Sequence, residues 1–239
     1  MITLLDIYHK LSYAFGPQHW WPADTPFEIA VGAILTQNTN WGNVEKAIQN
    51  LKSRDALSAR VIYEMPVKEL AELIRPAGYF NIKTQRLKSF INFLMSDYHG
   101  SMKQMKNGEM HLLREQLLAV SGIGPETADS ILLYALGKPV FVIDAYTKRV
   151  LSRHRILDDS RSYDEFQAIF HATLKKDEKL FNEYHALFVK VGKTFCRKSK
   201  PSCDICPLST FKNIKKINKL PLPFLAGEKK FGFYPGFIK

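Results

Sequence analysis

Asp144 is the residue of this 239-residue chain that is best placed for chemistry. It follows the apolar run 140–143 and precedes residues 145–151, which have the apolar spacing of a helix. An aspartate before a helix commonly caps it, because its carboxylate accepts hydrogen bonds from free backbone N–H groups. The apolar run also delivers this carboxylate to solvent, where it can face the sugar of a bound nucleotide. Both roles stay open for Asp144.

A glycine turn lies upstream of Asp144. Apolar residues at helical spacing stop at residues 121–124, where Gly122 and Gly124 allow backbone angles that other residues resist. Pro125 suits the first position of a second helix, which Gly137 ends. Backbone amides then converge at the start of a helix, an arrangement that binds phosphate. The plainer alternative is a corner between two helices whose glycines serve only the turn.

The composition favours a polyanionic partner. The formal net charge is +11, and hydrophobic residues make up 46% of the chain, enough for one domain or two small lobes. The apolar runs are too short to span a bilayer, and the chain opens without a charged leader and a long apolar stretch. We therefore expect a monomeric protein of the cytoplasm, associated with the nucleoid and without membrane contact.

The hairpin at 117–128 (LLAVSGIGPETA) and the segment 141–150 (FVIDAYTKRV) together resemble the helix-hairpin-helix DNA glycosylases of the endonuclease III superfamily. The resemblance runs from about residue 25 to 206. It implies an all-α, two-lobed fold with the active-site cleft between the lobes. One lobe would span 25–135, the other would join 1–24 to 136–206, and 207–239 would be a basic, aromatic tail of open role.

This resemblance implies a base-excision-repair enzyme that binds double-stranded DNA, extrudes a damaged nucleotide and hydrolyses its N-glycosidic bond. Asp144 matches the catalytic carboxylate. In the lyase members, the position of Glu126 holds a lysine that forms a Schiff base with the sugar, and an acid cannot do that chemistry. The sequence therefore predicts a monofunctional glycosylase that leaves an abasic site.

The resemblance also assigns DNA contacts. Gln37 matches the glutamine beside the gap left by the extruded base, and Tyr79 matches the residue pushed into the base stack. The basic and aromatic residues that follow Tyr79, namely Phe80, Lys83, Arg86 and Lys88, favour backbone contact and stacking. Other DNA contacts are expected at Gly122, Gly124, Thr127, Lys148 and Arg149. The polar segment 99–111 is expected to be a loop.

All three tryptophans lie near expected loops. Adjacent side chains in a loop point in different directions, so Trp20 and Trp21 cannot easily enter one core, although packing under the loop is the alternative. Trp20-Trp21-Pro22 and Trp41 match the 3-methyladenine DNA glycosylase III branch. Indoles attract flat cations, which suits an alkylated purine such as 3-methyladenine. The expected base pocket consists of Trp20, Trp21, Pro22, Trp41, Glu126 and Lys193.

Two other functions stay open. One is a bifunctional, endonuclease III-like glycosylase and AP lyase acting on oxidised bases, with Lys193 doing the lyase chemistry. The other is a non-catalytic helix-hairpin-helix protein that binds DNA.

The chain contains three cysteines, which argues against a disulfide framework. Cys196, Cys203 and Cys206 match the start of the family's C-x6-C-x2-C-x5-C motif, but Lys212 stands where the fourth cysteine would fall. A [4Fe–4S] cluster normally takes four thiolates. We expect a remnant that binds no metal and a reaction that needs no cofactor; a cluster with an unusual or external fourth ligand is the alternative.

Overall fold

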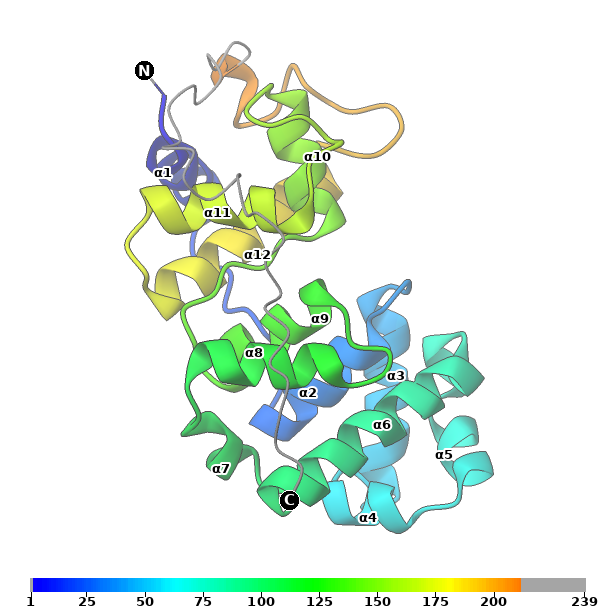
Figure 1. Ribbon diagram of the computed structural model, residues 1–239. Helices are drawn as coiled ribbons and strands as arrows, with labels where there is room; N and C mark the ends of the chain where they lie inside the picture. Colours follow the sequence, from blue (N-terminus) through cyan, green and yellow to red (C-terminus); the bar gives the residue numbers. More distant parts are fainter. Residues whose placement is uncertain (1, 212–239) are drawn as a thin grey trace, which may run out of the picture.

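The computed structural model describes residues 2–211, and its regular elements within that range are all helical (Figure 1). The predicted tail lies outside the described residues from position 212 onward. The α-helices are α1 (Leu4–Phe15), α2 (Pro26–Leu35), α3 (Trp41–Ser53), α4 (Ala59–Glu64), α5 (Val67–Leu73), α6 (Phe80–Tyr98), α7 (Met102–Lys106), α8 (Met110–Ala119), α9 (Pro125–Ser130), α10 (Ala145–Arg153), α11 (Tyr163–Thr173) and α12 (Glu178–Thr194). Three shorter elements are η1 (Arg75–Ala77), the π-helical η2 (Ile131–Ala135) and η3 (Ser209–Phe211).

The helices form two groups, and the all-α, two-lobed prediction is confirmed. Figure 1 shows α1, α10, α11 and α12 together at one end and α2 to α7 at the other, with α8 and α9 nearer the middle. Helix α12 contacts α1 and α10, whereas α6 contacts α2, α4 and α5. The non-helical segments 16–25 and 137–144 connect the two groups. We propose these segments as the lobe boundaries.

The segment 99–111 is not the predicted loop. Ser101 caps α7 by accepting a hydrogen bond from the Gln104 amide, and Met102 and Met105 are buried beneath it. Helix α8 then begins at Met110. Two apolar side chains three residues apart are enough to hold one helical turn against the core, and the surrounding polar residues hid this signal.

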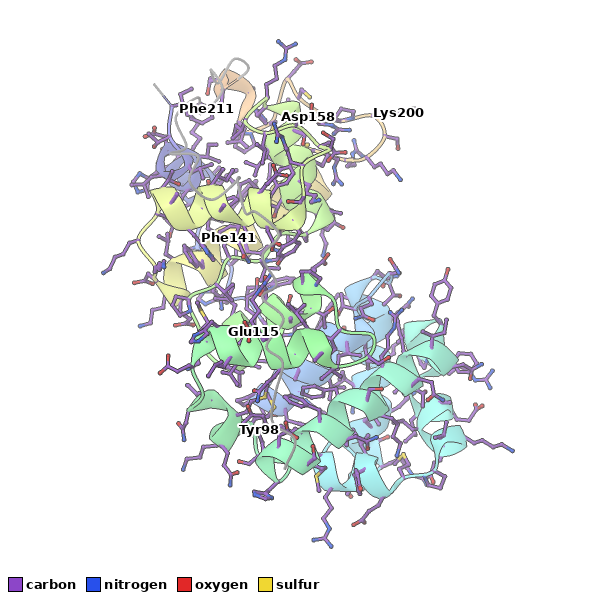
Figure 2. All side chains as sticks on the ribbon, viewed as in Figure 1. Tyr98, Glu115, Phe141, Asp158, Lys200 and Phe211 are labelled. Atoms are coloured by element: carbon purple, nitrogen blue, oxygen red, sulfur yellow. The ribbon has the colours of Figure 1, made fainter. Side chains whose placement is uncertain are left out.

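Stacked aromatic rings fix the connector that leads to Asp144. Phe141 stacks on Phe170 with ring centroids 3.7 Å apart, and Tyr184 stacks on Phe188 at 4.8 Å. Figure 2 shows Phe141 between the two groups of helices, on the side of α11 and α12. Such pairs contribute about 0.5–1.5 kcal/mol each beyond their buried area. The connector is therefore a rigid part of the core.

Hydrogen bonds hold the same connector on the α11 side. The backbone N–H of Phe141 donates to Nε2 of His171 (3.0 Å), and that of Ile143 donates to the Tyr163 hydroxyl (3.2 Å). The amide of Gln167 donates to the carbonyl of Phe141 (2.7 Å). These bonds satisfy backbone groups that have no helical partners, and they fix the position of the residue that follows, Asp144.

One buried carboxylate joins these helices to the other lobe. Asp129 of α9 accepts hydrogen bonds from the Tyr163 hydroxyl (2.8 Å) and the Gln167 amide (2.7 Å). It also forms an ion pair with Arg114 of α8 at 2.7 Å. A fully buried carboxylate needs such a complete set of donors, because an unpaired buried charge is costly.

Candidate active site

Asp144 caps α10, as its position in the sequence predicted. Its Oδ1 accepts a hydrogen bond from the Thr147 amide at 2.7 Å. The prediction that its carboxylate is delivered to solvent is wrong, because the residue is only 9% exposed. The aromatic and hydrogen-bonded connector holds Asp144 largely buried rather than on an open surface. Its second oxygen, Oδ2, faces Nε2 of His185 at 3.6 Å.

The surroundings keep Asp144 ionised. Burial raises the pKa of this carboxyl, but the His185 ring and the Thr147 amide oppose burial and outweigh it. The net effect places the pKa of Asp144 below its usual range. A charged carboxylate is thus held in a partly dry site, where it stabilises a nearby positive charge more strongly than it would in water.

Glu126 lies in the first turn of α9 and forms the second acid of the site. The side chain is exposed at the surface, although enough protein lies near its carboxyl group to desolvate it in part. The resulting desolvation and the repulsion from Asp144 raise the pKa of Glu126 to about 7, against opposing effects of His185 and Lys148. The site therefore contains one carboxylate and one carboxyl group that titrates near neutral pH.

Sequence reasoning missed Tyr134 and His185 as site residues. The Tyr134 hydroxyl lies 2.5 Å from Nδ1 of His185, and both side chains are buried. Burial first, and then the charge of Asp144, raise the pKa of Tyr134 well above its usual value. Both residues have the helical spacing of core positions, and 51 residues separate them. No local pattern in the sequence links them to Asp144.

The tryptophans meet at Tyr134. Trp21 contacts the edge of Trp41 at a centroid distance of 5.2 Å and lies 5.1 Å from Tyr134. Trp20 lies 5.7 Å from Trp21, and the Nζ of Lys193 lies 5.9 Å from the Trp20 ring. The indole N–H groups of Trp20 and Trp21 are buried without a hydrogen-bond partner among the described residues.

Gly32 of α2 lies against this aromatic group, at a distance where a Cβ would make ordinary van der Waals contact. A Cβ at this position would lie 3.5 Å from the Trp21 indole and 3.6 Å from that of Trp41. Four of the six predicted pocket residues, namely Trp20, Trp21, Trp41 and Lys193, therefore lie in one group, and the charge of Glu126 acts on Tyr134 in the same group. Pro22 is exposed at the end of the tryptophan loop.

The glycine hairpin contacts Gln37. The side-chain amide of Gln37 donates to the carbonyl of Gly122 (3.1 Å) and to Oγ1 of Thr127 (2.9 Å), and its oxygen accepts a hydrogen bond from Arg86. Gly122 has a φ of +86°, which favours glycine, whereas Gly124 caps α9 with a φ of −95°. The hairpin and the predicted gap-facing glutamine thus form one unit.

Two lysines after Tyr79 donate to backbone carbonyls of their own lobe. Lys83 is 1% exposed, and its ammonium donates to the carbonyls of Leu35 and Ala77, both at 2.8 Å. Lys88 donates to the carbonyls of Ile62, Tyr63 and Met65. Both satisfy the free carbonyls at helix ends, so the expectation of backbone contact is wrong for them. Tyr79 itself is 69% exposed at the start of α6, as an intercalating side chain requires.

Lys148 and Arg149 make contacts within their own lobe. The Nζ of Lys148 lies 5.2 Å from the Phe166 ring, and Arg149 donates to the carbonyls of Cys196 (2.7 Å) and Gly192 (3.2 Å). The Arg149 bonds hold α10 against the end of α12, and the Lys148 contact joins α10 to α11. The phosphate contacts predicted for both residues stay a proposal.

The three cysteines line a cavity of 320 Å³ together with Arg153 and His154. Arg153 donates to the carbonyls of Arg197 and Lys198 and lies 3.4 Å from the Cys196 sulfur. Within residues 2–211 no three His, Cys, Asp or Glu side chains are arranged to hold a metal ion. The chain has no fourth cysteine, so its donor set does not fit a four-thiolate cluster. Lys200 lies on the loop between the cysteines (Figure 2).

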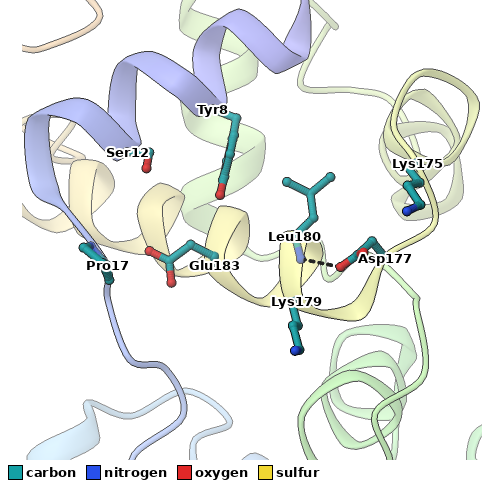
Figure 3. Close-up of a pocket in the computed structure, with 8 residues that line it drawn as sticks. All are labelled: Tyr8, Ser12, Pro17, Lys175, Asp177, Lys179, Leu180 and Glu183. Atoms are coloured by element: carbon teal, nitrogen blue, oxygen red, sulfur yellow. Dashed lines mark hydrogen bonds between the residues drawn. The ribbon is translucent and has the colours of Figure 1, made fainter.

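A separate groove lies between α1 and α12. Its volume is 480 Å³, and Figure 3 shows its lining residues Tyr8, Ser12, Pro17, Lys175, Asp177, Lys179, Leu180 and Glu183. None of the predicted site residues is among them. In the described part of the chain, no helix combines the length and the apolar character needed to cross a bilayer.

A family profile and a related protein sequence both identify the same family of DNA repair proteins. The profile described as HhH-GPD superfamily base excision DNA repair protein matches residues 31–176. A putative DNA repair glycosylase of Methanocaldococcus jannaschii is 49% identical over 209 residues, which cover 87% of this chain and 94% of that protein.

Two solved structures are also similar. The H. pylori 3-methyladenine DNA glycosylase bound to 1,N6-ethenoadenine has a TM-score of 0.70 at 28% identity, covering 80% of this chain and 98% of that one. Endonuclease III in a non-covalent DNA complex has a TM-score of 0.75 at 21% identity, covering 88% and 95% respectively, which shows a common fold.

Proposed function

Because this chain belongs to the HhH-GPD superfamily of base excision DNA repair proteins, we propose that it is a monofunctional DNA glycosylase for alkylated purines such as 3-methyladenine. The observation that carries this proposal is the group of tryptophans around Tyr134, on which two acids, Glu126 and Asp144, also act through their charges. Purines alkylated at N3 or N7 are flat cations, and each indole contact with such a cation contributes about 0.5–2 kcal/mol.

The reaction requires little acid catalysis on such a substrate. The glycosidic electron pair moves to the cationic base, which leaves as a neutral molecule, while positive charge develops on the deoxyribose. Asp144 is the proposed catalytic residue, because an ionised carboxylate in a partly dry site stabilises that charge. Water then adds to the sugar carbon, its proton is released, and an abasic site remains.

DNA engagement is proposed for the hairpin side of the cleft. The duplex backbone would meet the amides of Gly122 and Gly124 with Thr127, Lys148 and Arg149 nearby. Tyr79 and Gln37 would fill the space left by the extruded nucleotide. We place the protein in the cytoplasm at the nucleoid, acting as a monomer.

No cluster is needed for these steps. The residues Cys196, Cys203 and Cys206 supply three thiols. Arg153 holds the loop between Cys196 and Cys203 by donating hydrogen bonds to two backbone carbonyls of that loop. A protein purified from iron-supplemented cells is expected to contain less than stoichiometric iron. It is also expected to lack the visible absorbance band that is typical of iron–sulfur clusters. A brown protein with four irons per chain would contradict this.

The test of the main proposal uses duplexes alkylated at purines. Wild-type protein is expected to release free 3-methyladenine, and Asp144→Asn is expected to lose at least about 100-fold in rate while binding the duplex equally well. Equal binding without base release by either protein would favour a non-catalytic DNA-binding module. No borohydride-trapped adduct is expected, because Glu126 replaces the lyase lysine.

A bifunctional lyase on oxidised bases is the second candidate, and one observation favours it. The Nζ of Lys193 lies 5.9 Å from the Trp20 ring, beside the group formed by the three tryptophans. A trapped adduct that disappears in Lys193→Gln, with oxidised pyrimidines as the preferred substrates, would establish this function in place of the first.

A further inference from the structure

A chain of three buried groups runs from Tyr134, which contacts Trp21, to the proposed catalytic carboxylate. The Tyr134 hydroxyl lies 2.5 Å from Nδ1 of His185, and Nε2 of the same ring lies 3.6 Å from Oδ2 of Asp144. His185 is 5% exposed, and its Nε2 has no hydrogen-bond partner among the described residues. Nδ1 of the imidazole is therefore hydrogen-bonded to Tyr134, and Nε2 faces Asp144.

The geometry selects one tautomer of a neutral His185 ring. If Nδ1 carried the proton, the lone pair of Nε2 would face the Asp144 carboxylate and repel it. If Tyr134 donates its proton to Nδ1, Nε2 carries an N–H that points toward Oδ2 and attracts it. Tyr134 keeps its phenolic proton at neutral pH, because burial raises its pKa. The hydroxyl is thus available as the donor.

We propose that His185, oriented by Tyr134, is a positioning residue that holds Oδ2 of Asp144 toward the deoxyribose. This inference rests on the proposed function of Asp144. Oδ1 is already bound by the Thr147 amide, so the imidazole, 3.6 Å from Oδ2, faces the oxygen that the N-cap leaves without a bond. A carboxylate held in one orientation pays a smaller entropic cost to reach the geometry that the reaction needs.

The charges around Asp144 set the sign of the expected pH effect. Glu126 of α9 repels the carboxylate, His185 of α12 attracts it, and the Thr147 amide of α10 donates to it. Lys148 of α10 acts on Glu126, and Tyr134 of η2 is neutral. Without His185, burial and Glu126 act against ionisation of Asp144. The acid limb of the kcat profile is then expected to move to higher pH.

The experiment measures kcat and KM for base release from an alkylated duplex between pH 3 and 8, with the uncatalysed release at each pH subtracted. His185→Phe is expected to lower kcat about 10- to 100-fold at pH 7, with KM changed less than about twofold. Its acid limb is expected to rise by about one pH unit. His185→Gln, whose amide reaches the position of Nε2, is expected to recover most of kcat, and Tyr134→Phe to show a smaller shift in the same direction.

A second buried histidine of the same lobe provides the control. His171 accepts a hydrogen bond from the Phe141 amide, and burial lowers its pKa to about 4. His171→Gln is expected to lower thermal stability without moving the acid limb. A loss of kcat in His185→Phe that is equal at every pH, or no loss at all, would overturn the inference. If His185→Phe does not fold, Tyr134→Phe tests the inference, and an acid limb at the wild-type pH in that variant would overturn it.

A measurement that needs no activity separates this inference from the proposed function. The side-chain carboxyl carbon of Asp144, followed by NMR against pH, is expected to titrate at higher pH in Tyr134→Phe and in His185→Phe than in the wild type. If the wild type releases no base but this shift appears, only the proposed function fails. If the titration is the same in all proteins, the positioning role fails, whatever the activity.

Discussion

The side-chain amide of Gln37 donates to the carbonyl of Gly122 across 3.1 Å, although 85 residues separate them in the chain. This bond attaches the end of α2 to the hairpin. Arg86 adds to it by donating to the Gln37 oxygen while its aliphatic part lies against Gly122. The segment proposed to enter the DNA gap is therefore prepositioned by the segment proposed to hold the DNA backbone.

We expect Gln37→Ala to weaken binding of a duplex that contains an abasic analogue by about tenfold, because a prepositioned polar group and its two hydrogen bonds are lost. Fluorescence anisotropy measures this affinity. Gln85→Ala, which changes an exposed glutamine of α6, is the matched control and should leave affinity unchanged. Equal affinities for all three proteins would remove Gln37 from the DNA interface.

Gly122→Ala should destabilise the protein by about 2 kcal/mol or more. A Cβ at this position would lie 2.2 Å from Cγ of Arg86, and the φ of +86° is itself unfavourable for alanine. Gly124→Ala should cost less than about 1 kcal/mol, because nothing lies within 4 Å of its Cβ and its φ is −95°. Urea denaturation compares them, and equal costs would show that the turn tolerates a side chain.

Glu126 predicts a pH dependence of substrate binding. Its pKa of about 7 means that the side chain gains negative charge as pH rises from 6 to 8. KM for a duplex with a cationic purine should therefore fall over this range, and Glu126→Gln should remove the trend. Glu115→Gln, an exposed acid of α8, is the control. A wild-type KM that is flat across this range would count against Glu126 as a pocket acid.

The same residue affects stability with a definite sign. Between pH 4.5, the ordinary value, and about 7, the folded protein holds a proton on Glu126 that the unfolded chain has released. The contribution of Glu126 to the free energy of unfolding therefore declines as pH rises through this window. In Glu126→Gln this decline should be absent, which chemical denaturation at several pH values measures. A variant that keeps the same slope would contradict the raised pKa.

Lys83→Met should lower the free energy of unfolding by about 2 kcal/mol. The apolar side chain fills similar space but leaves the carbonyls of Leu35 and Ala77 without their donor. Lys103→Met, at an exposed position of α7, should change stability by less than about 0.5 kcal/mol. If the two substitutions cost the same, the lysine does not cap these helix ends.

Local sequence signals were sufficient for the hairpin and for Asp144 as a cap. Two glycines, a proline and an aspartate each act within a few residues of their own position, and the structure places them in the predicted turn and N-cap. The tryptophan group was accessible because three indoles outside long apolar helices are unusual enough to notice. These features depend on neighbours along the chain.

Long-range pairings were not accessible. Tyr134 and His185 have the spacing of core residues, and only the packing of η2 against α12 brings them together. Lys83 and Lys88 appear exposed in a charged stretch, because composition does not show that a lysine points inward to a helix end. The depth of Asp144 was mispredicted for the same reason, since aromatic residues from α11 and α12 cover the connector before it.

Asp129 also has a consequence for how the molecule melts. Arg114 reaches its carboxylate from one end of the protein, while Tyr163 and Gln167 reach it from the other. When either end unfolds, the Asp129 carboxylate stays in a nonpolar interior but loses some of its hydrogen-bond or ion-pair partners. Neither end can therefore lose its structure alone at low cost, and calorimetry should record a single heat-absorption peak rather than two.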